Sequence, residues 1–256
     1  MTERITPRST IDTSPTGRIP AQQADRQARI EELRAAKRKT DRRKSLAAVC
    51  VCLLGACAAF GKTGYNWVEH KVHDPLKQSI VSFGVPLADA GCGTITADRA
   101  APSGQHVSEG TRVAYATVPP TSGRHYDRQV SFDADPFFTT KNNPPVENLV
   151  QNLEHGYTVL WYDSTLPRKK QDEIQGLAAK LRNDAIYQLF IATPWDPAYG
   201  ALPNGKPIAL SHWSGPATRN GPAYGHRLFC GQLSGAGVRE FMDKFPATDA
   251  PERNIR

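Results

Sequence analysis

The chain has 256 residues, of which 39% are apolar and 22% are charged, so there is room for a packed core in one or two domains. Its net charge of +7 is concentrated near the N-terminus, where the first 45 residues hold 12 Lys and Arg against 6 Asp and Glu. The rest of the chain holds 20 against 19 and is almost neutral. This distribution argues against a nucleic-acid-binding domain, which would carry its basic residues on the folded surface.

The basic N-terminal tail, residues 1–45, divides into two parts. Residues 1–20 have too few apolar side chains to order themselves and are predicted to be disordered. Residues 22–44 consist mostly of good helix formers and are predicted to be helical. The basic end of this helix is suited to contact anionic lipid headgroups.

An uncharged stretch, Leu46–Phe60, follows the tail directly. Continued to Trp67 it is interrupted only by Lys62, and its roughly 22 residues are enough for a helix to cross a bilayer. Because Lys and Arg crowd its N-terminal side, the positive-inside rule predicts a cytoplasmic N-terminus and an extracytoplasmic C-terminal domain. We therefore predict a single transmembrane helix at 46–67 in the cell membrane. Two alternatives stay open: a cleaved signal peptide, and a lipidated Cys57 in "LLGAC".

The cysteines bear on the compartment. Cys50, Cys52 and Cys57 lie within the predicted span and act as small apolar residues. The remaining two, Cys92 and Cys230, suggest a disulfide in an exported domain, which would stabilise the fold by about 4–5 kcal/mol in the chain-entropy model. Two separate thiols are the alternative.

Residues 68–256 are predicted to form one α+β domain with a mixed or antiparallel sheet. Alternating or continuous apolar patterns predict strands, and apolar residues at helical spacing predict helices. The strands are expected at 111–118, 157–163, 185–194 and 206–213, and the helices at 146–153, 167–183 and 237–245. The consecutive elements from 157 to 194 fit either a βαβ unit or an antiparallel layout. His212 is expected within a strand, His226 within a loop, and His70 and His73 near the membrane.

The stretch "VPPTSGRHY", residues 118–126, predicts a rigid turn that leads into a histidine. Pro119 and Pro120 stiffen its entry, and the hydroxyls and amides of Thr121, Ser122 and Gly123 are able to hold a carboxylate or phosphate. His125 leaves this turn in a fixed direction, as a ligand or catalytic imidazole requires. The alternative is a turn that merely ends strand 111–118.

The stretch "NLVQNLEHGY", residues 148–157, places Glu154 beside His155. Adjacent side chains diverge on regular structure, so both reach one ion only if the backbone bends, as Gly156 permits. A divalent ion such as zinc or copper requires three or four N, O or S donors. His125, His155, Glu154 and His106 are the candidate ligands, and Glu154 is also the candidate general base. No HExxH or CxxC spacing, nucleophile elbow or phosphate-binding loop accompanies them.

These two motifs, with the basic helix and the span before them, resemble the bacterial family known as domain of unknown function 3105. That family carries "PPTSGPHY"-like and "LVHNLEHG"-like segments, and the resemblance runs from about Ala90 to Glu252. It implies a membrane-anchored architecture but no reaction. This chain departs from the family at Arg124, where a proline is usual, and at Gln151, where a histidine is usual. If that histidine is a ligand in relatives, this chain has lost it or replaced it with a weaker oxygen donor.

The leading hypothesis is a single-pass membrane protein with an extracytoplasmic His/Glu pocket that binds a divalent metal. Its partners would be the lipid bilayer and an unspecified envelope ligand, without nucleic acid. The second hypothesis is a noncatalytic envelope-binding or scaffold module, in which the histidines and Glu154 form a structural hydrogen-bond network. The third is a metal-dependent hydrolase, which needs an open coordination position.

Overall fold

The computed structural model describes residues 74–216 and 221–252, which lie in one compact unit, His70–Arg256. The predicted tail, the predicted span at 46–67, His70 and His73 lie outside the described residues. Among the helices that are described, none combines the length and the apolar character needed to cross a membrane.

The centre of the domain is a five-stranded mixed sheet in the order β1-β7-β6-β4-β5. Only β4 and β5 pair in parallel, and the other neighbours are antiparallel. The strands are β1 (Thr96–Arg99), β4 (Thr158–Tyr162), β5 (Phe190–Pro194), β6 (Ile208–Ser214) and β7 (Tyr224–Cys230). A separate parallel pair joins β2 (His106–Val107) to β3 (His125–Tyr126). The predicted α+β class and mixed sheet are confirmed.

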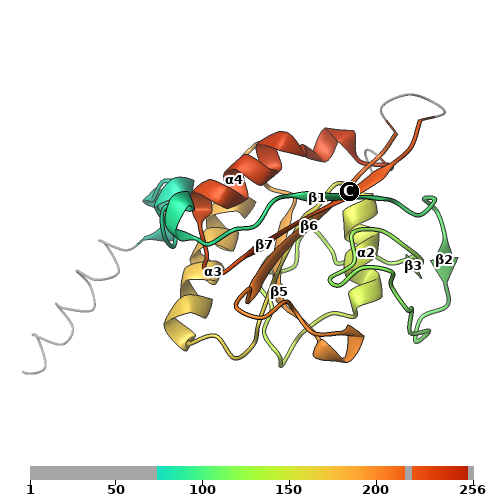
Figure 1. The fold of residues 1–256 in the computed structure, drawn as a ribbon, viewed down its shortest axis with the longest axis horizontal. Coiled ribbons are helices and arrows are strands. Elements are labelled where there is room, and N and C mark those ends of the chain that lie inside the picture. Colours follow the sequence, from blue (N-terminus) through green and yellow to red (C-terminus); the bar gives the residue numbers. More distant parts are fainter. Residues whose placement is uncertain (1–73, 217–220, 253–256) are drawn as a thin grey trace, which may run out of the picture. The chain divides into compact units, whose positions relative to one another are not determined.

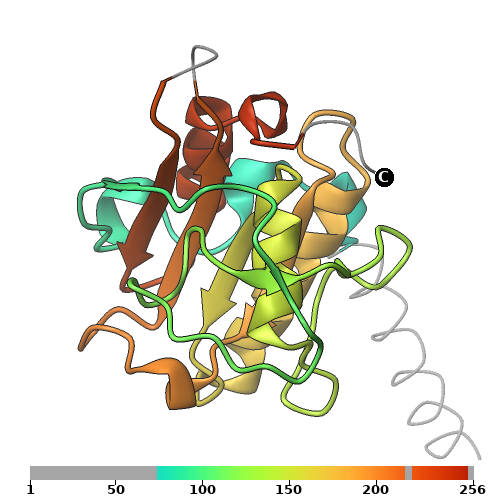
Figure 2. The same ribbon diagram turned by 90° about the vertical axis from the view of Figure 1, so that its right-hand side faces the viewer.

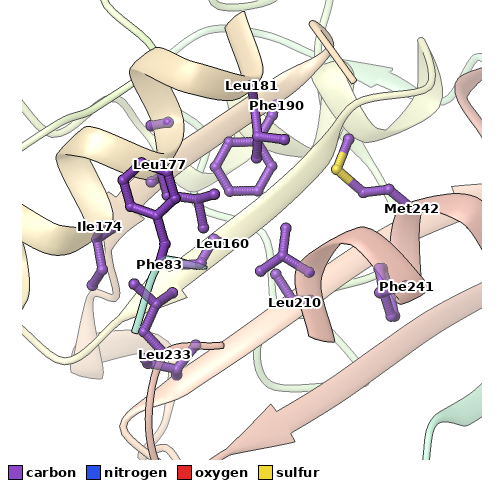
Figure 3. Close-up of a cluster of buried hydrophobic side chains, with 14 of the residues drawn as sticks. Phe83, Leu160, Ile174, Leu177, Leu181, Phe190, Leu210, Leu233, Phe241 and Met242 are labelled. Carbon is purple, nitrogen blue, oxygen red and sulfur yellow. The ribbon is translucent and has the colours of Figure 1, made fainter. Parts of the chain in front are cut away.

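Helices cover both faces of the sheet (Figures 1 and 2). On one face α3 (Arg168–Arg182) and α4 (Gly235–Lys244) enclose an apolar cluster with side chains of β4, β5 and β6. Figure 3 shows Leu177 and Leu181 of α3 converging with Phe241 and Met242 of α4 in this cluster. The other face packs against α2 (Val146–Glu154) around Trp161 and Trp213. The short 3-10 helices are η1 (Pro75–Lys77), η2 (Ile80–Ser82), η3 (Leu87–Asp89), η4 (Pro197–Tyr199) and η5 (Ala247–Asp249).

The predictions for the central helices and strands are confirmed, because the apolar patterns that predicted these elements are strong. The elements predicted at 157–163, 167–183 and 185–194 are β4, α3 and β5, and the parallel pairing of β4 with β5 makes them a βαβ unit. The helices predicted at 146–153 and 237–245 and the strand at 206–213 are also present, as α2, α4 and β6. The first residues predicted for β5 instead form a turn after α3, where Asp184 accepts hydrogen bonds from the backbone of Ile186 and Tyr187.

The strand predicted at 111–118 is wrong. Its side chains do alternate between exposed and half-buried, as the pattern indicated, but its backbone pairs with no strand. The buried carboxylate of Glu147 instead accepts a hydrogen bond from Val113 N at 2.9 Å and another from the Tyr199 hydroxyl at 2.8 Å. The Glu147 side chain of α2 therefore pairs with the Val113 N–H, a backbone group that a neighbouring strand was expected to pair with.

The expectation of a loop around His226 is also wrong, because His226 lies in β7 directly opposite His212 of β6. Gly225 and Gly231 resemble loop signals, yet Gly225 is needed inside the strand. A Cβ there would lie 2.1 Å from the Thr121 hydroxyl oxygen, so only glycine lets the 118–126 turn pack onto the sheet. The prediction that His212 lies in a strand is confirmed.

The predicted disulfide between Cys92 and Cys230 is present. It ties the segment before β1 to the last residue of β7 across a sequence separation of 138 residues. In the chain-entropy model a loop of this length contributes on the order of 4–5 kcal/mol.

Helix α2 ends at Glu154, and Gly156 follows its C-cap in the hydrogen-bond pattern that left-handed glycines support. Gly156 N donates to Leu153 O and Tyr157 N donates to Asn152 O, while Gly156 itself has φ of 89°. A Cβ on Gly156 would lie 2.5 Å from Ala247 O, because the chain after α4 passes directly over this turn. Gly156 is therefore required both by its conformation and by this close approach.

We expect Gly156→Ala to destabilise the protein more than Gly110→Ala. Gly110 has a similar φ of 84° but nothing within 4 Å of its missing Cβ. Both variants incur the left-handed penalty of about 1–2 kcal/mol, and only Gly156→Ala adds an overpacking cost of roughly 1–3 kcal/mol. Urea unfolding of both variants measures the difference. Equal losses of unfolding free energy would show that the close approach of Ala247 to Gly156 adds no cost.

Candidate functional site

His125 is held by the turn that precedes it. It lies on β3 and is fully buried, and its Nδ1 is 2.7 Å from Gly123 O. Because a carbonyl oxygen can only accept, Nδ1 must carry the proton in the neutral ring. The Nε2 atom then presents its lone pair, and it points to the side of the ring where Glu154 lies.

Glu154 is the last residue of α2 and is also fully buried. One carboxylate oxygen, Oε1, accepts a hydrogen bond from Gly104 N at 2.7 Å. The other, Oε2, lies 2.9 Å from His125 Nε2. Among the described residues, neither Oε2 nor His125 Nε2 has a well-directed hydrogen-bond partner, so their contact is ionic rather than a properly aligned hydrogen bond.

His106 reaches the same place through strand pairing. It is the register partner of His125 in the β2–β3 pair, and the two ring centroids are 5.1 Å apart. Its side chain is 38% exposed, and its Nδ1 lies 3.4 Å from the exposed carboxylate of Asp127. That contact orients the ring from outside, as carboxylates do for histidine ligands.

One ligand atom each from His106, His125 and Glu154 lies within 4.8 Å of the other two. Two imidazole nitrogens and one carboxylate oxygen form a donor set that divalent first-row metals accept. Two of the three residues are fully buried and the third is half-exposed, so an ion could enter from the His106 side. The three residues therefore fit a small cation.

The electrostatics of the buried pair favour opposite charges when no metal is bound. Burial by itself lowers the pKa of His125, but the contact with Glu154, the Gly123 carbonyl and the nearby charge of Glu252 outweigh it and raise the pKa. Burial raises the pKa of Glu154, yet the contact with His125 and the Gly104 N–H hold this pKa below its usual value. Both shifts favour an imidazolium beside a carboxylate in the metal-free site.

His155, predicted as a ligand, does not join this group. It caps α2 with non-helical angles, so its ring diverges from Glu154. Its Nε2 lies 2.7 Å from Gln151 Nε2, and its Nδ1 lies 3.4 Å from Glu252 O. Gln151 therefore contacts His155, and neither of the two belongs to the candidate metal-binding group of His106, His125 and Glu154.

The residues of the predicted turn support the site rather than face a ligand. Pro120 and Thr121 are buried, and Thr121 packs on Gly225 of β7. The Ser122 hydroxyl accepts a hydrogen bond from Ala101 N at 3.0 Å. Gly123 has φ of 137° and supplies the carbonyl that holds His125. The turn fixes the direction of one ligand and joins the 101–106 segment to it.

Sequence reasoning missed three residues around the site: Gly104, Asp127 and Glu252. Gly104 acts through its backbone N–H, which no sequence pattern reveals. Asp127 follows the "RHY" motif directly and could have been found by looking for a carboxylate near the histidines. Glu252 comes from the far end of the chain, and only the fold brings it close.

A second polar cluster lies on the opposite face of the sheet. His212 Nε2 contacts Asp249 Oδ1 at 2.9 Å, and the Ser214 hydroxyl donates to Asp249 Oδ2 at 2.8 Å. The ring of His226 stacks on Phe245, and burial, with the neighbouring His212, lowers the pKa of His226 to about 4. Because the Ser214 hydroxyl donates to the Asp249 carboxylate and not to His212 or His226, the cluster is not arranged as a nucleophilic triad.

Comparison with known proteins places the chain in a family. Searches of curated proteins and of solved structures found no match. A family model described as "Protein of unknown function (DUF3105)" matches residues 106–256, a range that contains all three residues of the candidate metal site. The match covers more than half of the chain, and the protein therefore belongs to the DUF3105 family.

Proposed function

We propose that this protein is a membrane-anchored, extracytoplasmic metal-binding protein that holds a divalent ion through His106, His125 and Glu154. The observation that carries the proposal is the convergence of three donors of which two, His125 Nε2 and Glu154 Oε2, are buried without a directed partner. Buried polar atoms normally have partners, so such a pair calls for an explanation. A bound cation would satisfy both atoms at once.

The surrounding residues prepare these donors for a metal. Gly123 O fixes the tautomer of His125, Asp127 orients His106, and Gly104 N–H occupies one oxygen of Glu154 while leaving the other free. Such outer contacts are typical of metal sites. Zinc or copper suits two nitrogens and one oxygen, and three protein ligands leave a position for water or an external ligand.

The location of the domain is part of the proposal. The uncharged stretch 46–67 with its basic N-terminal flank supports a single span that leaves residues 68–256 outside the cytoplasm. The disulfide between Cys92 and Cys230 supports the same side of the membrane, because such bonds persist in oxidising compartments. The bilayer is then the constant partner, and an envelope ligand would meet the site from the His106 side.

A second candidate role is structural, and the 2.9 Å contact between His125 and Glu154 favours it. With an imidazolium beside a carboxylate, the pair would tie β3 to the end of α2 without any metal. The two roles are compatible, because a metal would displace the proton of His125 and use the same atoms. They differ in whether the protein takes up stoichiometric metal.

We expect the full-length protein, purified in detergent and stripped of metal, to bind one Zn²⁺ or Cu²⁺ per chain by calorimetry and metal analysis. His106→Ala, His125→Ala and Glu154→Gln should each weaken binding by more than the roughly 10–100-fold that loss of an outer contact costs. His226→Gln is the control, because it alters a buried histidine of β7 that lies outside the group and stacks on Phe245. Metal lost equally in the control, or no uptake by the wild type, would contradict the proposal.

Without metal, stability should depend on pH through the buried pair. The contribution of His125, whose pKa is raised, is fully present below about pH 6.5 and is lost as pH rises through that raised pKa. The contribution of Glu154, whose pKa is lowered, is present above about pH 4.5 and is lost as pH falls through that lowered pKa. The difference in unfolding free energy between wild type and Glu154→Gln should therefore peak between about pH 4.5 and 6.5. Urea titrations in chelator would show a flat difference if the pair carried no charge.

A reporter fused after Arg256 tests the location. We expect alkaline phosphatase, which is active only outside the cytoplasm, to be active there, and a fluorescent protein that matures only in the cytoplasm to be dark. Replacing the six Lys and Arg between residues 37 and 44 by Gln is the control, because it should weaken the orientation bias. A bright cytoplasmic reporter on the wild-type chain would refute the proposed orientation.

A further inference from the structure

The C-terminal segment is held firmly against the candidate metal site. Glu252 N donates to the backbone oxygen of Glu154 at 3.1 Å, and Gly215 N donates to Asp249 O at 2.6 Å. Ala250 between them is 1% exposed. Backbone atoms of this segment approach Gly156 and Gly215 so closely that a Cβ on either would contact them. The position of Glu252 beside Glu154 is therefore set by backbone packing.

The carboxylate of Glu252 lies close to the site and is weakly held. Its Oε1 is 3.8 Å from the place where Gly104 would carry a Cβ, and Gly104 N is the group that donates to Glu154 Oε1. Within the described part of the chain its one ionic contact is to His155 Nδ1, at 3.9 Å. The Glu252 side chain is 32% exposed, so it keeps room to move.

The charge of a bound divalent ion would not be balanced by its three ligands alone. Two neutral imidazoles and one carboxylate leave a charge of about +1 in a site where two of the three side chains are fully buried. The carboxylate of Asp127 is 85% exposed, and solvent screens it. Glu252 is the other nearby carboxylate, because its backbone N–H donates to Glu154 O and its side chain lies beside Gly104. It is also the less exposed of the two.

We propose, building on the proposed metal site, that Glu252 is the second carboxylate of this centre and acts as an affinity-determining residue. Its negative charge offsets the charge left on a bound divalent cation without replacing any of the three ligands. The C-terminal segment thereby becomes part of the site, although its residues lie about a hundred positions beyond Glu154 in the chain. Loss of this charge should weaken binding of a divalent ion while leaving the ligands in place.

The test compares Zn²⁺ affinity of the full-length wild type with that of Glu252→Gln. We expect about a 10-fold loss at low ionic strength, consistent with one partly screened charge near the ion. The loss should shrink in high salt, because salt screens a half-exposed charge but not a lost ligand. Glu240→Gln, an exposed acid on α4, removes the same net charge on another element and should bind Zn²⁺ like the wild type.

Three other results would overturn this inference. Equal affinity of Glu252→Gln and wild type would leave the metal site intact but remove Glu252 from it. A loss as large as that of Glu154→Gln and insensitive to salt would make Glu252 a direct ligand instead of an outer charge. If the wild type bound no Zn²⁺, the proposed metal site itself would fail. Metal-free Glu252→Gln should still unfold in one cooperative urea transition, which separates a charge effect from a loss of structure.

Discussion

The site depends on the left-handed turn at Gly156 that follows α2. The left-handed glycine stops the helix directly after Glu154, turns His155 away from it, and starts β4 two residues later. The absence of a side chain at Gly156 also lets the segment around Ala247 pass over the turn. This one residue therefore ends the helix that carries Glu154 and admits the C-terminal segment that carries Glu252. Both depend on the space that only glycine leaves.

Burial explains why the same atoms suit either a proton or a metal ion. A buried carboxylate and a buried imidazole are costly unless each has a counter-charge or a ligand. In the metal-free protein each group supplies the counter-charge of the other, which is why the two pKa values move in opposite directions. A divalent cation would replace the shared proton and use the free lone pairs of both groups. The hydrogen bonds with Gly104 and Gly123 involve the other atoms of each side chain, so a bound cation would not compete for them.

Sequence patterns predicted the elements that bury a continuous apolar face, such as β4, α3 and β5, because hydrophobic periodicity reports local burial directly. They failed where backbone groups found unusual partners. In the alternating segment 111–118, Val113 N donates to the Glu147 carboxylate, and β7 contains Gly225, which resembles a loop signal. At the site, the motif around Glu154 and the turn before His125 were identified from the sequence. His155 was proposed with them, yet helix geometry turns it toward Gln151.

By itself the sequence determined the α+β class, the disulfide candidates Cys92 and Cys230, and a short list of residues whose side chains can bind a metal. Only the tertiary structure decided which of those residues meet. His106 joins His125 through a two-residue strand pair too short to leave a periodic pattern, and Glu252 reaches Glu154 from the end of the chain. The chemistry of each side chain and the local preference for helix, strand or turn can be derived from neighbouring residues. The packing of the whole domain sets which distant segments converge. It therefore decides that His106 and His125, and not His155, lie beside the Glu154 carboxylate.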